Sequence, residues 1–182
     1  MGQNIRKLTT SAICLALCII LPYFTGQIPQ IGQALGPMHI PVLLCGFIAG
    51  PAYAAIVGFA APLLRLMIAG MPMPFMAMSM CFELAVYGLV AGVAYRFLPK
   101  KPAYIYVSLI MAMLLGRIAW GMAAIQLWLS GFFPRLPNEW TQFGWEEFLS
   151  GAFLSSIPGI ILHILLIPPV VIALKKAKLL AE

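Results

Sequence analysis

The chain has 182 residues, of which 63% are hydrophobic and only 9% are charged, and its mean hydropathy is +1.00. This composition excludes a water-soluble globular protein and predicts an all-α integral membrane protein in the lipid bilayer. The net charge is +6, but the basic residues flank apolar runs, so we expect no nucleic acid among the partners.

The apolar runs predict six transmembrane helices in one domain that covers residues 1–182. The first is Thr9–Phe24, and because no cleavage site follows its basic start, we expect a retained span and not a signal peptide. A loop rich in Gly, Pro and Gln follows at Thr25–Met38. His39–Ala69 is too long for one span and is interrupted by Gly50-Pro51, which predicts two short helices. The remaining predicted helices are Met73–Leu98, Tyr104–Ser130 and Phe148–Leu174.

Three basic clusters decide the predicted orientation of these helices. They are Arg6–Lys7, Arg96–Lys101 and Lys175–Lys178, and cytoplasmic membrane flanks are typically basic. If all three are cytoplasmic, His39–Ala69 has to cross twice, which gives a six-helix bundle with both termini in the cytoplasm. The loop Gly131–Glu147, rich in Trp, Phe and Pro, then lies outside, where it forms an interfacial belt or closes over a ligand.

The absence of known catalytic and metal-binding motifs, and the positions of the cysteines, exclude several classes of function. The chain has no Walker A loop, no metal-ligand spacing and no hydrolase motif, so we predict no ATPase activity, no metal and no cofactor. Ser155, Ser156 and His163 share one predicted helix and lie too far apart to act as nucleophile and base, so we predict that the chain is not an enzyme. The four cysteines lie in apolar runs and are expected to be free, buried thiols: Cys14, Cys18, Cys45 and Cys81.

Ionisable residues inside predicted spans are costly and usually face a partner or a cavity. Glu83 and Arg117 fall at comparable depth, so they either form a buried ion pair or line a ligand pocket. Arg65 lies near the outer end of its helix, where it can snorkel or bind a ligand. His163 is expected to be a neutral imidazole bonded to a neighbouring helix.

Several further polar and aromatic residues complete a candidate site near the outer face. His39 stands at the boundary between the first loop and the next helix, where it either caps that helix or lines the site. Trp120, Gln126 and Trp128 follow Arg117 along the same helix. The predicted ligand-binding residues are therefore His39, Arg65, Glu83, Arg117, Trp120, Gln126 and Trp128.

The first helix carries a pair of small residues, Ala12 and Ala16, one turn apart. Small residues at this spacing make a flat surface against which another helix packs closely. The pattern is common in membrane helices, and a contact inside the bundle explains it as well as a contact with a partner subunit.

Together these features resemble the substrate-binding S components of energy-coupling factor (ECF) vitamin transporters. The size, the six helices, the polar first loop, the Ala12/Ala16 pair and the missing ATP site all agree with that family. Three segments carry the likeness further, and it spans most of the chain: Leu35–Gly46, Pro62–Arg65 and Phe82–Leu89.

The resemblance implies a function and partners. A prokaryotic plasma-membrane S component binds one small-molecule vitamin tightly from outside, between the outer halves of its last helices and under the loops. The Ala12/Ala16 face would dock on a transmembrane coupling subunit that rests on two cytoplasmic ATPases. ATP-driven toppling of the S component would then release the vitamin inside.

The substrate remains open between two classes. Arg65 and Arg117 suit a carboxylate, which favours pantothenate. Glu83 with Trp120 and Trp128 suits a flat heterocycle instead, such as a queuosine precursor, a pyrimidine or a pyridoxine-type ring. A self-sufficient secondary carrier is a further alternative. It would need a continuous polar path across the membrane, whereas the inner halves of the predicted helices are almost wholly apolar.

Overall fold

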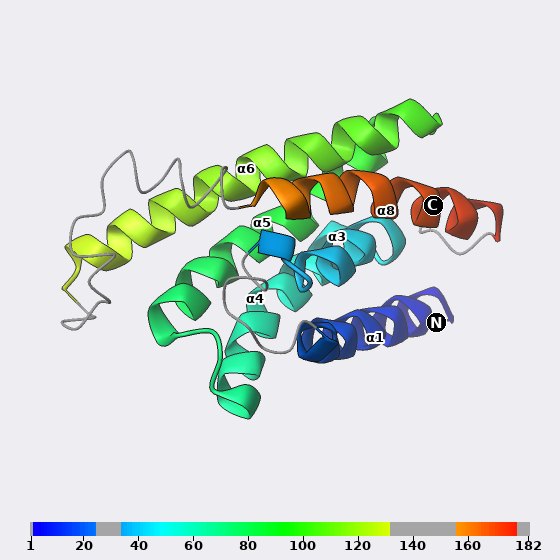
Figure 1. Ribbon diagram of the computed structural model, residues 1–182. Coiled ribbons are helices and arrows are strands. Elements are labelled where there is room, and N and C mark those ends of the chain that lie inside the picture. The colour runs from blue at the N-terminus through cyan, green and yellow to red at the C-terminus, as the bar shows by residue number, and fades with distance from the viewer. Residues whose placement is uncertain (1, 25–33, 132–155, 178–182) are drawn as a thin grey trace.

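The computed structural model describes residues 2–24, 34–131 and 156–177. Within these residues the chain is helical and has no strands, and the helices lie against one another in one bundle (Figure 1). The all-α prediction is therefore confirmed, including the break at Gly50-Pro51. The helices are α1 (Gly2–Phe24), α3 (His39–Ile48), α4 (Pro51–Ala69), α5 (Pro74–Phe97), α6 (Pro102–Leu129) and α8 (Ile157–Lys176).

Five of the described helices are long and apolar enough to cross a membrane, and α3 is the exception. Its 10 residues extend for about 15 Å, half of a hydrocarbon core of roughly 30 Å. The predicted sixth crossing is thus only partly helical. α3 starts at His39, as predicted, after a turn in which Gly36 has a φ of +53° and its carbonyl accepts the backbone N–H of His39 at 2.9 Å. It ends at Ile48, just before the break at Gly50-Pro51.

The ends of the outer helices differ from the predicted ends. α1 begins at Gly2 and not at Thr9, because a helix can continue past the hydrocarbon boundary and carry its basic residues into the headgroup region. α8 ends at Lys176, two residues beyond the predicted end. The predicted start of that span, Phe148, lies outside the described residues.

Glycines let the central helices approach closely. A Cβ atom on Gly58 of α4 would lie 2.3 Å from the carbonyl oxygen of Leu84 in α5, and one on Gly46 of α3 would lie 2.7 Å from that of Gly88. Such contacts between small residues are typical of membrane helix packing. Gly50 differs from these glycines, because it has open space around it and a φ of +98°. Its role is to make the turn between α3 and α4.

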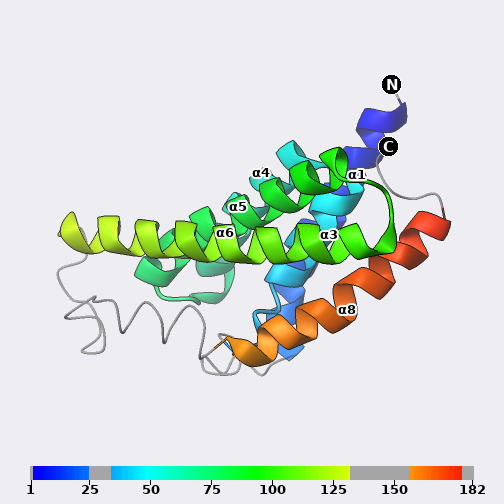
Figure 2. The ribbon, with the colours of Figure 1, turned by 90° about the horizontal axis from the view of Figure 1, so that it is seen from above.

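The basic residues gather at one end of the bundle, called the basic end below. Figures 1 and 2 show the start of α1, the α5–α6 connection and the last turn of α8 at the same end. Lys175 of α8 donates a hydrogen bond to the carbonyl of Lys100 in that connection. By the positive-inside rule the basic end is cytoplasmic, and the α4–α5 connection lies at the outer end.

One stripe of α1 packs into the bundle, and the opposite side faces outward. The buried stripe consists of Ser11, Cys14, Cys18 and Pro22. Ala12 and Ala16 are both exposed. All four cysteines of the chain are free and buried, as predicted.

Candidate functional site

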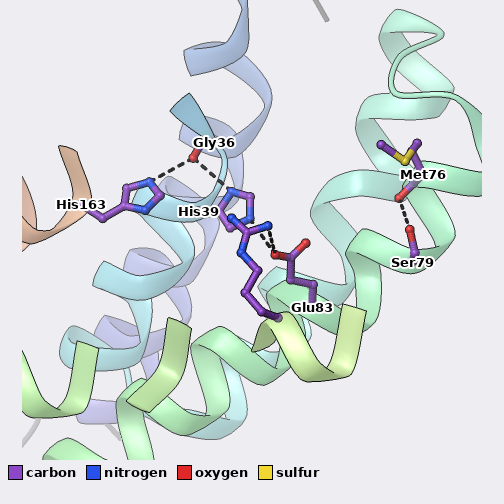
Figure 3. Close-up of polar contacts among 7 residues, drawn as sticks. Gly36, His39, Met76, Ser79, Glu83 and His163 are labelled. Carbon is purple, nitrogen blue, oxygen red and sulfur yellow. Dashed lines mark hydrogen bonds and ion pairs between the residues drawn. The ribbon is translucent and has the colours of Figure 1, made fainter. Parts of the chain in front are cut away.

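A cluster of charged and polar side chains lies inside the bundle, where α3, α5 and α6 meet. Glu83 of α5 is 2% exposed, and its Oε1 lies 3.0 Å from Nη1 of Arg117 in α6. The same Oε1 lies 3.5 Å from Nε2 of His39, the first residue of α3. Of the two alternatives that their comparable depth left open, the ion pair between Glu83 and Arg117 is present, and Figure 3 shows His39 beside Glu83. Because Glu83 is the one carboxylate side chain of the described residues, this is the main electrostatic feature of the interior.

The cluster lies in the outer half of the bundle. With a rise of about 1.5 Å per residue, Glu83, Arg117 and His163 all lie about 20 to 22 Å from the basic ends of their helices. The hydrocarbon core is only about 30 Å thick. The cluster is therefore closer to the outer surface than to the cytoplasm.

A single backbone oxygen joins α8 to this cluster. The carbonyl of Gly36 lies 3.1 Å from Nδ1 of His39 and 3.3 Å from Nε2 of His163 in α8 (Figure 3). A carbonyl oxygen only accepts, so both imidazoles donate to it. The two rings lie with their centroids 5.8 Å apart. His163 thus bonds to the backbone of the turn before α3, and not to a neighbouring helix as expected.

The ring of Tyr87 packs against that of His39. It follows Glu83 by one helical turn on α5, so both side chains occupy the same face. Its ring centroid lies 5.1 Å from that of His39. On the other side a Cβ atom at Gly116 of α6 would lie 2.2 Å from the tyrosine ring, so only glycine lets α6 bring Arg117 this close.

Three buried polar atoms of the cluster lack a hydrogen-bond partner among the described residues. They are Nε2 of His39, Oε1 of Glu83 and Nε of Arg117. Oε1 nevertheless lies at ion-pair distance from Arg117 and His39. Buried polar groups are nearly always satisfied in proteins, so a bound molecule that supplied partners to these three atoms would fit at this place.

Arg65 is buried, but it is not part of this cluster. It donates a hydrogen bond from Nη1 to the carbonyl of Ile19 in α1 at 3.0 Å. Its guanidinium carbon lies 5.2 Å from the ring centroid of Tyr23. The structure therefore places Arg65 at the contact between α4 and the end of α1, and not against Glu83 or His39.

The predicted aromatic and amide residues of α6 divide into two groups. Trp120 is 3% exposed and lies one turn beyond Arg117. Gln126 is exposed and Trp128 is 37% exposed, further towards the outer end of α6. The described residues of the first loop include Gly36 and Met38, whereas most of the predicted outer loop Gly131–Glu147 lies outside the described residues.

Sequence reasoning missed Gly36 and Tyr87 and left His163 out of the site. The spacing of four residues between Glu83 and Tyr87 is a signal that could have identified the tyrosine. No sequence pattern indicated the Gly36 carbonyl, because a backbone acceptor carries no residue-type signature. His163 lies 127 positions from it in the chain, and only the packing brings them together.

Residues 6–171 match the family model described as ECF transporter, substrate-specific component. The chain belongs to this family. No curated protein and no solved structure matches the chain. The match covers nearly the whole chain, so the family assignment applies to the bundle as a whole and not to one segment of it.

Membership settles the coarse function. S components are integral proteins of the plasma membrane and act as substrate-capture subunits of ECF importers. They work with an energising module of ATPases and a transmembrane subunit, and the family is one of transport subunits and not of enzymes. The self-sufficient carrier and the intramembrane enzyme are therefore set aside.

Proposed function

We propose that this S component captures pantothenate at the cluster of His39, Glu83 and Arg117. The observation that carries the proposal is the unsatisfied Nε of Arg117, a buried cationic donor in the outer half of the bundle. A carboxylate or carbonyl oxygen is the acceptor that such a donor requires, and charge-assisted hydrogen bonds of this kind are strong in a dry site.

The charge around the cluster favours an anionic or neutral ligand over a cationic one. Arg117 already balances the charge of Glu83, so a cationic vitamin finds no unpaired carboxylate in the described residues. The N-terminus of α3 also lies at the cluster, since His39 is its first residue. Helices that begin inside a membrane direct the positive end of their dipole at anionic substrate groups in other transporters.

A flat heterocycle is the second candidate, and the position of Trp120 favours it. This indole is buried one turn from Arg117, where a ring could stack on it. A queuosine precursor, a pyrimidine or a pyridoxine-type ring would place its polar edge towards Glu83 and Arg117. Trp128 and Gln126 lie further out and would contact only a longer ligand.

A titration of the purified chain in detergent tests the proposal. Tryptophan fluorescence is followed while pantothenate, riboflavin, thiamine, biotin, pyridoxine and a deazapurine base are added in turn. Saturable binding of pantothenate at sub-micromolar concentration supports the first candidate, and binding of a ring compound alone supports the second. Binding of thiamine alone would contradict both, because thiamine is cationic.

We further propose that the Ala12/Ala16 face of α1 docks on the transmembrane coupling subunit. Both residues are exposed, opposite the stripe by which α1 packs on the bundle. The flat surface suits close helix packing with a partner. Two cytoplasmic ATPases would complete the complex on the basic side.

Replacing both alanines by leucine should abolish uptake while the Kd for the ligand stays within about two-fold. Uptake into cells and binding by the purified chain are measured on the same variant. The matched control is Ala52→Leu, which places the same side chain at an exposed position of α4 and should leave uptake intact. Loss of ligand binding in the double variant would show that the face belongs to internal packing.

A further inference from the structure

The hydrogen-bond roles at the cluster follow from the Gly36 carbonyl. Nδ1 of His39 lies 3.1 Å from this oxygen, and since the oxygen only accepts, Nδ1 carries the hydrogen. In a neutral imidazole the other nitrogen, Nε2, then presents a lone pair. That nitrogen points to Oε1 of Glu83 at 3.5 Å.

Arg117 already balances the charge of Glu83, with Nη1 3.0 Å from Oε1, so a protonated His39 would be an uncompensated charge in the membrane interior. With His39 neutral, its Nε2 and Oε1 of Glu83 are two acceptors that face each other, and neither has an aligned hydrogen-bond donor among the described residues. On the other side of this pair, Nε of Arg117 is a donor without an acceptor. A ligand that satisfies all three atoms would therefore donate a hydrogen bond to His39 and Glu83 and accept one from Arg117.

We infer that the ligand of this site carries a hydrogen-bond donor directly beside an acceptor oxygen. The donor, a hydroxyl or ring N–H, bridges Nε2 of His39 and Oε1 of Glu83. The adjacent carbonyl or carboxylate oxygen accepts from Nε of Arg117. This inference rests on the proposed function and narrows it to α-hydroxy acids, α-hydroxy amides and lactam rings. Pantothenate, with a hydroxyl beside its amide carbonyl, is one member of the class.

The arrangement also predicts that the site discriminates strongly between ligands that carry the donor and ligands that lack it. All three atoms are fully buried, so a ligand that pairs with them does so away from water. A ligand that lacks the donor leaves two acceptors buried together. Such unsatisfied groups lower affinity far more than the loss of an equal apolar contact does.

The test compares two pairs of probes on three proteins. The first pair is pantothenate and the analogue that lacks only the hydroxyl beside the amide, and the second pair is uracil and 1,3-dimethyluracil, which has no lactam N–H. In the wild-type chain, removal of the donor should raise the Kd by about 10- to 100-fold. In Glu83→Gln the amide itself donates to Nε2 of His39, so the ratio of the two Kd values should fall below about three-fold.

Ser79→Ala is the matched control, because Ser79 lies one turn before Glu83 and, among the described residues, its hydroxyl donates to the carbonyl of Met76 in its own helix, at 3.1 Å (Figure 3). It should keep the wild-type ratio. A wild-type ratio near one, or a ratio that Glu83→Gln leaves unchanged, overturns the inference. If Glu83→Gln does not fold, the wild-type ratio alone decides.

The inference and the proposed function fail in different ways. Tight binding of a vitamin without a donor–acceptor edge, with no binding of either probe pair, overturns the inference and leaves substrate capture intact. If the folded chain binds no small molecule of the panel, the proposed substrate and the inference both fall.

Discussion

Two arginines lie inside this bundle, Arg65 buried and Arg117 partly exposed, and they are held in different ways. Arg117 is paired with a carboxylate, Glu83, and keeps one buried donor without a partner. Arg65 donates to a backbone carbonyl of α1 and lies over the ring of Tyr23. The difference teaches that burial of a cation in a membrane helix does not by itself mark a binding site. The proposed binding site rests instead on the unsatisfied donor of Arg117, whereas Arg65, bound to the end of α1, fixes the position of that helix.

The largest effect is expected from Arg117→Ala. Removal of this partner leaves the Glu83 carboxylate buried without its ion pair, which should lower the free energy of unfolding by about 3 to 5 kcal/mol. Unfolding in SDS titrations, followed by circular dichroism, measures the change. The double variant Glu83→Ala/Arg117→Ala should be more stable than the sum of the single effects predicts. Simple additivity would show that the two charges are not coupled.

Arg65→Met should have a smaller effect on stability and almost none on ligand affinity. It removes the bond to Ile19, and interhelical hydrogen bonds in membranes contribute about 0.6 to 1.7 kcal/mol. The Kd for the ligand should stay within about two-fold of wild type. Binding to the Arg65→Met and Arg117→Ala variants is measured in parallel by tryptophan fluorescence. A loss of affinity as large as that of Arg117→Ala would return Arg65 to the site, where its sequence position first suggested it.

The smallest effect is expected from Tyr23→Leu, which removes the ring beneath Arg65. The contribution of such a cation–π contact is about 0.5 to 1 kcal/mol. The substitution should destabilise the wild-type chain by this amount but have no such effect in the Arg65→Met background, because the cation is already absent. An equal loss in both backgrounds would show that Tyr23 acts through packing alone.

The sequence predicted those parts of the fold that depend on local pattern. The break at Gly50-Pro51 and the spans Met73–Leu98 and Tyr104–Ser130 match α4, α5 and α6 to within two residues. Counting residues along two helices was also enough to place Glu83 opposite Arg117. Depth in a membrane follows from distance along a helix, so a contact that depends on depth is predictable.

Rotation about the helix axis is not predictable in this way. Arg65 and Arg117 are both arginines inside spans, and only the packing decides that one faces α1 and the other Glu83. The convergence of His163 and His39 on the Gly36 carbonyl depends on how the segment before α3 turns at a positive φ.

The four native cysteines bear on how the docking of α1 can be followed. All are free and buried, so maleimide reagents, which attack accessible thiolates, should label the folded chain slowly. A single cysteine placed at the exposed position of Ala16 would then be the main reactive thiol without removal of any native one. A fluorophore attached there would report the arrival of the coupling subunit on α1, and its departure, in the otherwise unaltered chain.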